Sequence, residues 1–156
     1  MANYSEKFAQ VGQSLGYEAP APKEPKIILP VRVDGNIAYI SGNVAFSGTE
    51  LLFKGRIGAD VSVEDGQRSA AFSVLNCLLA LDRSVGLDKV DKVLKVTGFL
   101  SCTESFTDQP TVMNGGSQVL LDVFGEAGQH ARSALGIHTL PLGASTEVEM
   151  IVALKA

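Results

Sequence analysis

The sequence predicts an α+β domain in which helices pack on one face of a mixed β-sheet. Two patterns support this fold class. Apolar residues recur with helical spacing in three segments, and β-branched or alternating runs lie between and after them, in the order helix, three strands, helix, strand, helix, two strands. The chain has 156 residues, of which 46% are hydrophobic and 19% charged. This length and composition fit one domain with a substantial core.

The first helix is predicted over residues 4–15, where one stripe contains Tyr4, Phe8, Val11 and Leu15. Gly16 supplies a stop, and Pro20, Pro22 and Pro25 form a stiff connector. We therefore interpret residues 1–25 as an N-terminal helix with a Pro-rich connector and residues 26–156 as the main domain. Nothing in the first segment indicates chemistry, so packing is its expected role.

The strongest helical pattern begins at Ser62 and ends at Gly86, with a stripe formed by Ala71, Val74, Leu75, Leu78, Leu81 and Val85. Asp65 stands at the capping-box distance from Ser62, although its side chain is shorter than the usual Glu.

A further helix is predicted over residues 112–124. Gly115 and Gly116 each weaken it by about 1 kcal/mol relative to Ala. Two interpretations remain open: a close backbone approach requires these glycines, or the helix begins only after Gly116.

The first two strands, residues 26–33 and 37–41, are joined by a tight turn at Asp34-Gly35 or Gly35-Asn36. Pro30 lacks an N–H group, so the first strand should be an edge strand or carry a bulge. Further strands are predicted over residues 51–54 and 90–102.

Residues 130–154 predict two final strands joined by a turn at Pro141 and Gly143. In the last strand one face is apolar, whereas the other carries two carboxylates before becoming apolar; the faces are Val148, Met150, Val152 and Leu154, and Glu147, Glu149, Ile151 and Ala153. Such a mixed face is unusual for a surface that only meets water and indicates an oligomer interface or a cleft. Arg132 and Glu147 open the two arms. They form either a salt bridge that closes the hairpin or a pair that meets a small anionic ligand.

Charge and cysteine usage exclude several classes of function. Thirteen basic residues are scattered among seventeen acidic ones, for a net charge of -4, so nucleic acid is an unlikely partner. Cys77 and Cys102 have no metal-ligand spacing and are expected to be buried free thiols; no metal is predicted. We find no apolar signal core and no membrane-spanning run, so the expected compartment is the cytoplasm.

Several short motifs together resemble the Rid family, the reactive intermediate deaminases, also called YjgF-like or endoribonuclease L-PSP-like. The C-terminal signature is carried by Ala131-Arg132-Ser133, Leu140-Pro141 and Glu147-Val148-Glu149. Upstream, the likeness includes Tyr39-Ile40-Ser41-Gly42-Asn43, the helix with Ala70, Ala71 and Asn76, and the strand at Val93 to Thr97. The resemblance covers about residues 26 to 154, and the combination is specific although each piece alone is weak.

The resemblance implies a chorismate-mutase-like fold and a homotrimer whose sheets enclose a central β-barrel, with a small carboxylate bound in each cleft between subunits. It also implies hydrolysis of reactive enamines or imines to 2-keto acids and ammonia, with no cofactor. Arg132 would hold the substrate carboxylate and Glu147 would be the general acid and base. Glu149 is a weaker candidate, and Ser41 and Ala134 fall at substrate-binding positions of the family.

This chain departs from the deaminase subgroup at two places. Leu29-Pro30-Val31-Arg32 stands where the subgroup has a tyrosine after Gly-Pro, and Ala134 stands where it has a cysteine. A carboxylate-binding or sensing trimer without hydrolysis is therefore the main alternative. An endoribonuclease or translation inhibitor, or a protein-holding chaperone, is less favoured: the chain is acidic, and His130 in a turn and His138 in a strand do not form a convincing catalytic pair.

Overall fold

The computed structural model describes residues 3–24 and 27–156. Its helices and strands follow one another as α1 (Tyr4–Ser14), β1 (Val31–Asp34), β2 (Ile37–Val44), β3 (Phe46–Ser47), β4 (Glu50–Leu51), α2 (Val63–Ser84), β5 (Val90–Ser101), α3 (Gln109–Phe124), β6 (Ala131–Ile137) and β7 (Thr146–Leu154). Short 3-10 turns lie at Leu87–Lys89, Gly125–Gly128 and Pro141–Gly143.

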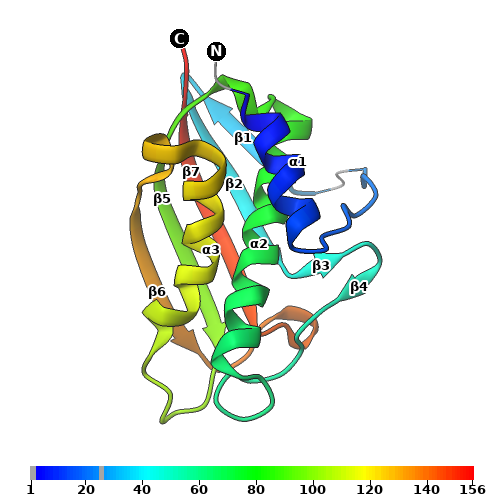
Figure 1. Ribbon diagram of the computed structural model, residues 1–156, viewed down its shortest axis with the longest axis vertical. Helices are drawn as coiled ribbons and strands as arrows, with labels where there is room; N and C mark the ends of the chain where they lie inside the picture. Colours follow the sequence, from blue (N-terminus) through cyan, green and yellow to red (C-terminus); the bar gives the residue numbers. More distant parts are fainter. Residues whose placement is uncertain (1–2, 25–26) are drawn as a thin grey trace.

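The main sheet has five strands in the order β1-β2-β7-β5-β6. Neighbouring strands are antiparallel except β5 and β6, which are parallel, so the sheet is mixed as predicted. Helices α2 and α3 lie side by side across one face of this sheet, and α1 packs against both helices (Figure 1). The α+β architecture with helices on one face is thereby confirmed.

The predicted hairpin between the last two strands is wrong. β5 lies between β6 and β7, so these two strands do not pair with each other. The physical reason is the parallel pairing of β5 with β6, for which α3 provides the crossover connection. The turn at Pro141–Gly143 then carries the chain past the end of β5 to its other side, where β7 pairs antiparallel with β5.

Two other strand predictions need correction. Within residues 51–54 only Leu51 is in a strand, and it belongs to a separate two-stranded ribbon formed by β3 and β4. Phe53 has a φ of 55°, which extended structure does not allow. The strand predicted at 26–33 begins at Val31, and Lys26 lies outside the described residues. β1 is an edge strand, as Pro30 indicated.

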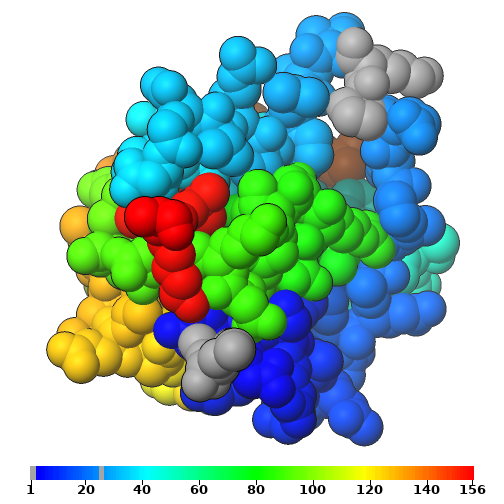
Figure 2. Space-filling model, turned by 90° about the horizontal axis from the view of Figure 1, so that it is seen from above, coloured from blue at the N-terminus to red at the C-terminus, as the bar shows by residue number. Residues whose placement is uncertain are grey.

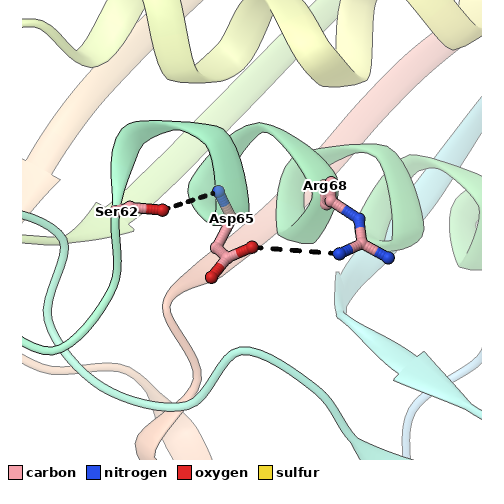
Figure 3. A network of polar contacts seen from close by, with 3 residues as sticks. All are labelled: Ser62, Asp65 and Arg68. Carbon is pink, nitrogen blue, oxygen red and sulfur yellow. Dashed lines mark hydrogen bonds and ion pairs between the residues drawn. The ribbon is translucent and has the colours of Figure 1, made fainter.

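Helix α2 begins with half of the predicted capping box (Figure 3). The Ser62 hydroxyl accepts a hydrogen bond of 3.1 Å from the Asp65 backbone N–H. The Asp65 carboxylate lies 3.9 Å from the Arg68 guanidinium one turn further on. The short Asp side chain thus pairs along the helix surface, and this exposed pair contributes little to stability.

The glycine pair lies inside α3, which begins at Gln109, so the interpretation that the helix starts only after Gly116 is wrong. A Cβ at Gly115 would clash with the backbone of Gln67 on α2. One at Gly116 would lie 2.9 Å from Val74 Cγ2 and 3.1 Å from the Ala70 carbonyl oxygen. Close approach of the two helices therefore requires glycine at both positions.

The N-terminal helix shares the core of the domain. Phe8 on α1 is buried in the same apolar cluster as Leu75, Leu78 and Val119, and the Tyr4 ring packs edge-on against Phe124 with centroids 4.8 Å apart.

Seen from above, the last residues of the chain lie between the β1–β2 turn and the segment before β5 (Figure 2). The Leu154 N–H donates to the Asn36 carbonyl at 2.7 Å there, which ties the end of β7 to that turn.

We predict that Gly115→Ala lowers the free energy of unfolding by about 1–3 kcal/mol, because the added methyl collides with the α2 backbone, which has no rotamer to change. Alanine is otherwise the better helix former. Urea unfolding measures the difference. Gly12→Ala on α1 is the matched control: its methyl would lie 3.3 Å from the movable Tyr17 ring, so it should be neutral or stabilising. Equal stability of both variants would contradict close packing at Gly115.

Candidate functional site

Arg132 lies on β6 with its side chain on the helix-covered face of the sheet. Its Cα pairs with Val96, which is fully buried beneath the helices. The guanidinium Nη1 donates to Asn114 Oδ1 at 2.9 Å and to Ser117 Oγ at 3.1 Å, and Nη2 donates to the Pro110 carbonyl at 3.3 Å. All three acceptors belong to α3, so this helix fixes the position of the arginine.

The contacts with α3 do not use all the N–H donors of the Arg132 guanidinium. An arginine has five N–H donors, and three hydrogen bonds to α3 leave two for another partner. Arg132 is partly exposed at the free edge of β6. A preorganised, accessible guanidinium of this kind is suited to a carboxylate, which it can bind through two parallel hydrogen bonds.

Glu147 lies near the start of β7 on the opposite face of the sheet. Its neighbour Thr146 is buried on the helix side, where it bonds to Ser69 and Ser73 of α2, so Glu147 must point the other way. The Glu147 carboxylate lies over Gly42, where a Cβ would come within 2.9 Å of Oε2. Burial raises the pKa of Glu147 above its ordinary value, and the neighbouring Glu149 carboxylate raises it further.

One chain does not bring Arg132 and Glu147 together. They lie on opposite faces of the sheet, on strands separated by β5. The proposed Arg132–Glu147 salt bridge is therefore wrong as an account of these residues within one subunit. Any ligand that touches both must lie between two copies of the chain.

The other residues predicted for the site divide between the two faces. Glu149 is exposed on the face of Glu147, and its Cα pairs with Thr97. Ser41 lies at a bulge in β2 beside Gly42, and its hydroxyl donates to the Leu29 carbonyl at 2.7 Å. Ala134 shares the helix-covered face with Arg132 and is half-buried.

Sequence reasoning missed the residues that hold Arg132. Asn114 and Ser117 are one helical turn apart on α3 and flank the glycine pair. Their spacing puts both side chains on one face of that helix, which was a usable signal for a shared partner. The partner itself became apparent only when β6 was placed beneath α3.

The fold and these residues define a class: an α+β protein with helices on one face of a mixed sheet, an arginine held by α3 on the edge strand and a glutamate on the uncovered face. A family model described as "YjgF/chorismate mutase-like, putative endoribonuclease" matches residues 24–154. The chain belongs to this YjgF-like family.

Its relatives include proteins from a protozoan and from bacteria. Protein TCP17 of Trypanosoma cruzi is 36% identical over 146 residues, which cover 92% of this chain and 91% of that protein. The Agrobacterium tumefaciens protein Atu1372, of unknown function, superposes with a TM-score of 0.88 at 30% identity, covering 97% of this chain and 95% of that one. A Shewanella oneidensis protein described as a "putative endoribonuclease" superposes with a TM-score of 0.84 at 26% identity, covering 97% of this chain and 99% of that one.

Across residues 3–24 and 27–156, no group of three or more His, Cys, Asp or Glu side chains could hold a metal ion. No helix in those ranges is long and apolar enough to cross a membrane.

We predict that Glu149→Gln lowers the pKa of Glu147 toward the ordinary value of a glutamate without reaching it, because burial, the larger cause of the raised pKa, remains. A raised carboxyl pKa means that ionising Glu147 opposes folding. The folded state favours the protonated Glu147 carboxyl. This contribution to stability is fully present below the ordinary Glu pKa of about 4.3 and is lost as pH rises through the folded-state pKa. Glu147→Gln should remove this loss.

Carboxyl-carbon NMR titration measures the first effect, and unfolding followed across the same pH range measures the second. Glu64→Gln, an exposed position on α2, is the control and should leave the Glu147 midpoint unchanged. A Glu147 midpoint that does not move in Glu149→Gln would refute the coupling between the two carboxylates.

Proposed function

We propose that the protein hydrolyses small 2-imino acids or their enamine forms to 2-keto acids and ammonia, in a site formed by Arg132 of one subunit and Glu147 of a neighbouring copy. The observation that carries the proposal is the state of Arg132: α3 holds it in place while two N–H groups remain for a ligand carboxylate. The family resemblance supplies the reaction class.

The chemistry needs few protein groups. Binding of the substrate carboxylate to Arg132 orients the adjacent C=N carbon toward an attacking water. The substrate reacts as its protonated imine: the water oxygen bonds to carbon, the C=N π electrons move to nitrogen, and Glu147 takes a proton from the water, which gives a carbinolamine. Glu147 then returns that proton to the amino nitrogen, ammonia leaves as the C=O bond forms, and the hydroxyl proton is released to the ammonia or to solvent. A raised pKa brings Glu147 closer to neutral pH, where one carboxyl group can both accept and donate a proton.

The uncovered face of the sheet supports assembly. It bears Tyr39 and Leu135, which are 48% and 46% exposed, together with the partly exposed Ile151 and Phe99. On the same face, Lys95 Nζ donates a hydrogen bond of 3.0 Å to Ser133 Oγ. Exposed apolar side chains framed by polar ones favour burial against a partner, and we infer a homotrimer whose sheets enclose a barrel, as the resemblance implies.

Carboxylate binding without hydrolysis is the second candidate function. Ala134 has no hydroxyl or thiol to present beside Arg132, and Val31 is buried and apolar at the place of the subgroup's tyrosine. The site therefore lacks two side chains that would hydrogen-bond the substrate, and turnover should be slower than in family members that keep them. A binding protein needs only the Arg132 half of the site.

We predict that Arg132→Lys weakens binding of 2-ketobutyrate by about tenfold or more while fold and assembly persist, because lysine keeps the charge but loses the planar fork. Calorimetric titration measures the affinity, and circular dichroism checks the fold. Arg68→Lys, exposed on α2, is the control and should bind like the parent. An unfolded Arg132→Lys variant, or unchanged affinity, would instead assign Arg132 a structural role.

We predict that Glu147→Gln abolishes release of keto acid from freshly generated 2-aminoacrylate while leaving 2-ketobutyrate binding nearly unchanged. Glu149→Gln should affect turnover much less. Glu147→Gln is expected to be inactive, and Arg132→Lys is expected to turn over little at low substrate concentration because it binds the carboxylate weakly. Because the two residues come from different subunits, trimers reassembled from equal amounts of both variants should regain about a quarter of the sites.

Light scattering on the parent and on the mixture reports the assembly that this experiment requires. Mixed trimers without activity would place both residues in the same subunit's site. A parent protein that binds 2-ketobutyrate but releases no keto acid from the imine would establish the binding function in place of hydrolysis.

A further inference from the structure

A hollow lies at the C-terminal end of β6, away from Arg132. Its volume is about 280 Å³, and its walls come from the loop before α2, the end of β5, the start of α3 and the end of β6. The residues that line it are Arg56, Cys102, Thr103, Glu104, Phe106, Gln109, Gly136, Ile137 and His138. Arg132 is not among them, and neither is Glu147.

The backbone of Arg56 is held firmly at the mouth of this hollow. Its carbonyl accepts N–H bonds from residues 59, 60 and 61, and its own N–H donates to Asp60 Oδ2 at 3.1 Å. The next residue, Ile57, is fully buried and bonds to the end of β5: its N–H donates to the Ser101 carbonyl at 2.9 Å, and its carbonyl accepts from Thr103 N–H at 3.1 Å. The loop therefore has little freedom to withdraw the guanidinium.

The guanidinium of Arg56 is incompletely satisfied. Nη2 donates to the Cys102 carbonyl, whereas Nε is buried and has no hydrogen-bond partner among the described residues. Buried donors in native proteins are nearly always paired with protein or with a bound molecule, and a charged donor has the strongest need of one. Nε has almost no accessible surface, so a molecule in the hollow would bond to the Nη groups, whose remaining N–H donors have no hydrogen-bond partner among the described residues. A negatively charged acceptor is favoured there because arginine remains cationic.

The rest of the lining limits what that acceptor can belong to. The Gln109 side-chain amide donates its hydrogens within the protein, to the Phe106 carbonyl at 2.9 Å and to Cys102 Sγ at 3.6 Å. Phe106 and Ile137 add partly exposed apolar surface. Glu104 is exposed and brings a negative charge to the opening, which disfavours a multiply charged anion.

We propose that this hollow binds a small organic acid, with a single carboxylate on Arg56 and a short apolar body against Phe106 and Ile137. The site is independent of the proposed reaction and of Arg132. Thr103 and His138 lie in its lining and add a hydroxyl and an imidazole that can contact the same ligand.

The test is NMR titration of the full-length, nitrogen-15-labelled protein with butyrate, butyramide and inorganic phosphate at constant ionic strength. Butyrate should produce saturable shifts of the Cys102, Gln109 and Gly136 amides in the parent and equally in Arg132→Lys. Butyramide, which lacks the charge, should not. Phosphate should bind more weakly than butyrate because of Glu104.

Two variants change this affinity in opposite directions. Arg56→Gln should weaken butyrate binding by about tenfold, since the charge-assisted bonds are lost. Glu104→Gln should tighten it by about two- to threefold, since an exposed like charge is removed. Arg68→Gln and Glu126→Gln, which are exposed elsewhere, are the matched controls and should leave it unchanged.

The proposal is overturned if shifts cluster only around Asn114 and Ser117, if Arg56→Gln binds like the parent, or if no saturable binding occurs. Tighter binding of phosphate than of butyrate would overturn the assignment to organic acids. If Arg56→Gln does not fold, Glu104→Gln decides, because a site for an anion requires tighter binding in that variant. None of these outcomes depends on hydrolysis, so failure of the proposed function leaves the test intact.

Discussion

The placement of β5 between β6 and β7 is the constraint on which the functional geometry depends. β5 pairs parallel with β6 and antiparallel with β7, so its neighbours on the two sides carry side chains in a fixed register. Val96 is opposite both Arg132 and Met150, whereas Phe99 is opposite both Leu135 and Glu147. Because side chains alternate along a strand, this register sends Arg132 toward the helices and Glu147 away from them.

Close packing of the two large helices makes the arginine half of the site possible. Gly115 and Gly116 allow the backbone of α3 to approach α2 closely. Asn114 and Ser117 then reach Arg132 from the same stretch of α3. The glycines weaken the helix by itself, and their benefit appears only in the contact between helices.

The glutamate half of the site is supported by a buried group of hydroxyls, Ser69, Ser73, Ser145 and Thr146. All four side chains are fully buried, and they are linked by bonds of 2.8 to 2.9 Å between α2 and the start of β7. A buried network is stable only when its members are all paired, so the start of β7 has little freedom to slide along α2. The position of Glu147, the next residue, is determined by that anchoring.

By itself the sequence determined the helices, the two faces of β7 and the residues that resemble the family signature, and it limited the first strand to an edge position or a bulge. These features follow from local periodicity, from the missing N–H of Pro30 and from residue type, which are all properties of short segments. Only the tertiary structure decided that β6 and β7 are not neighbours and that Arg132 and Glu147 face opposite ways. It also decided which side chains hold Arg132, and that Arg56 Nε has no hydrogen-bond partner among the described residues. The physical reason is that alternation shows which residues share a face but not which strand lies alongside, and pairing partners are set by long-range contacts that no single segment contains.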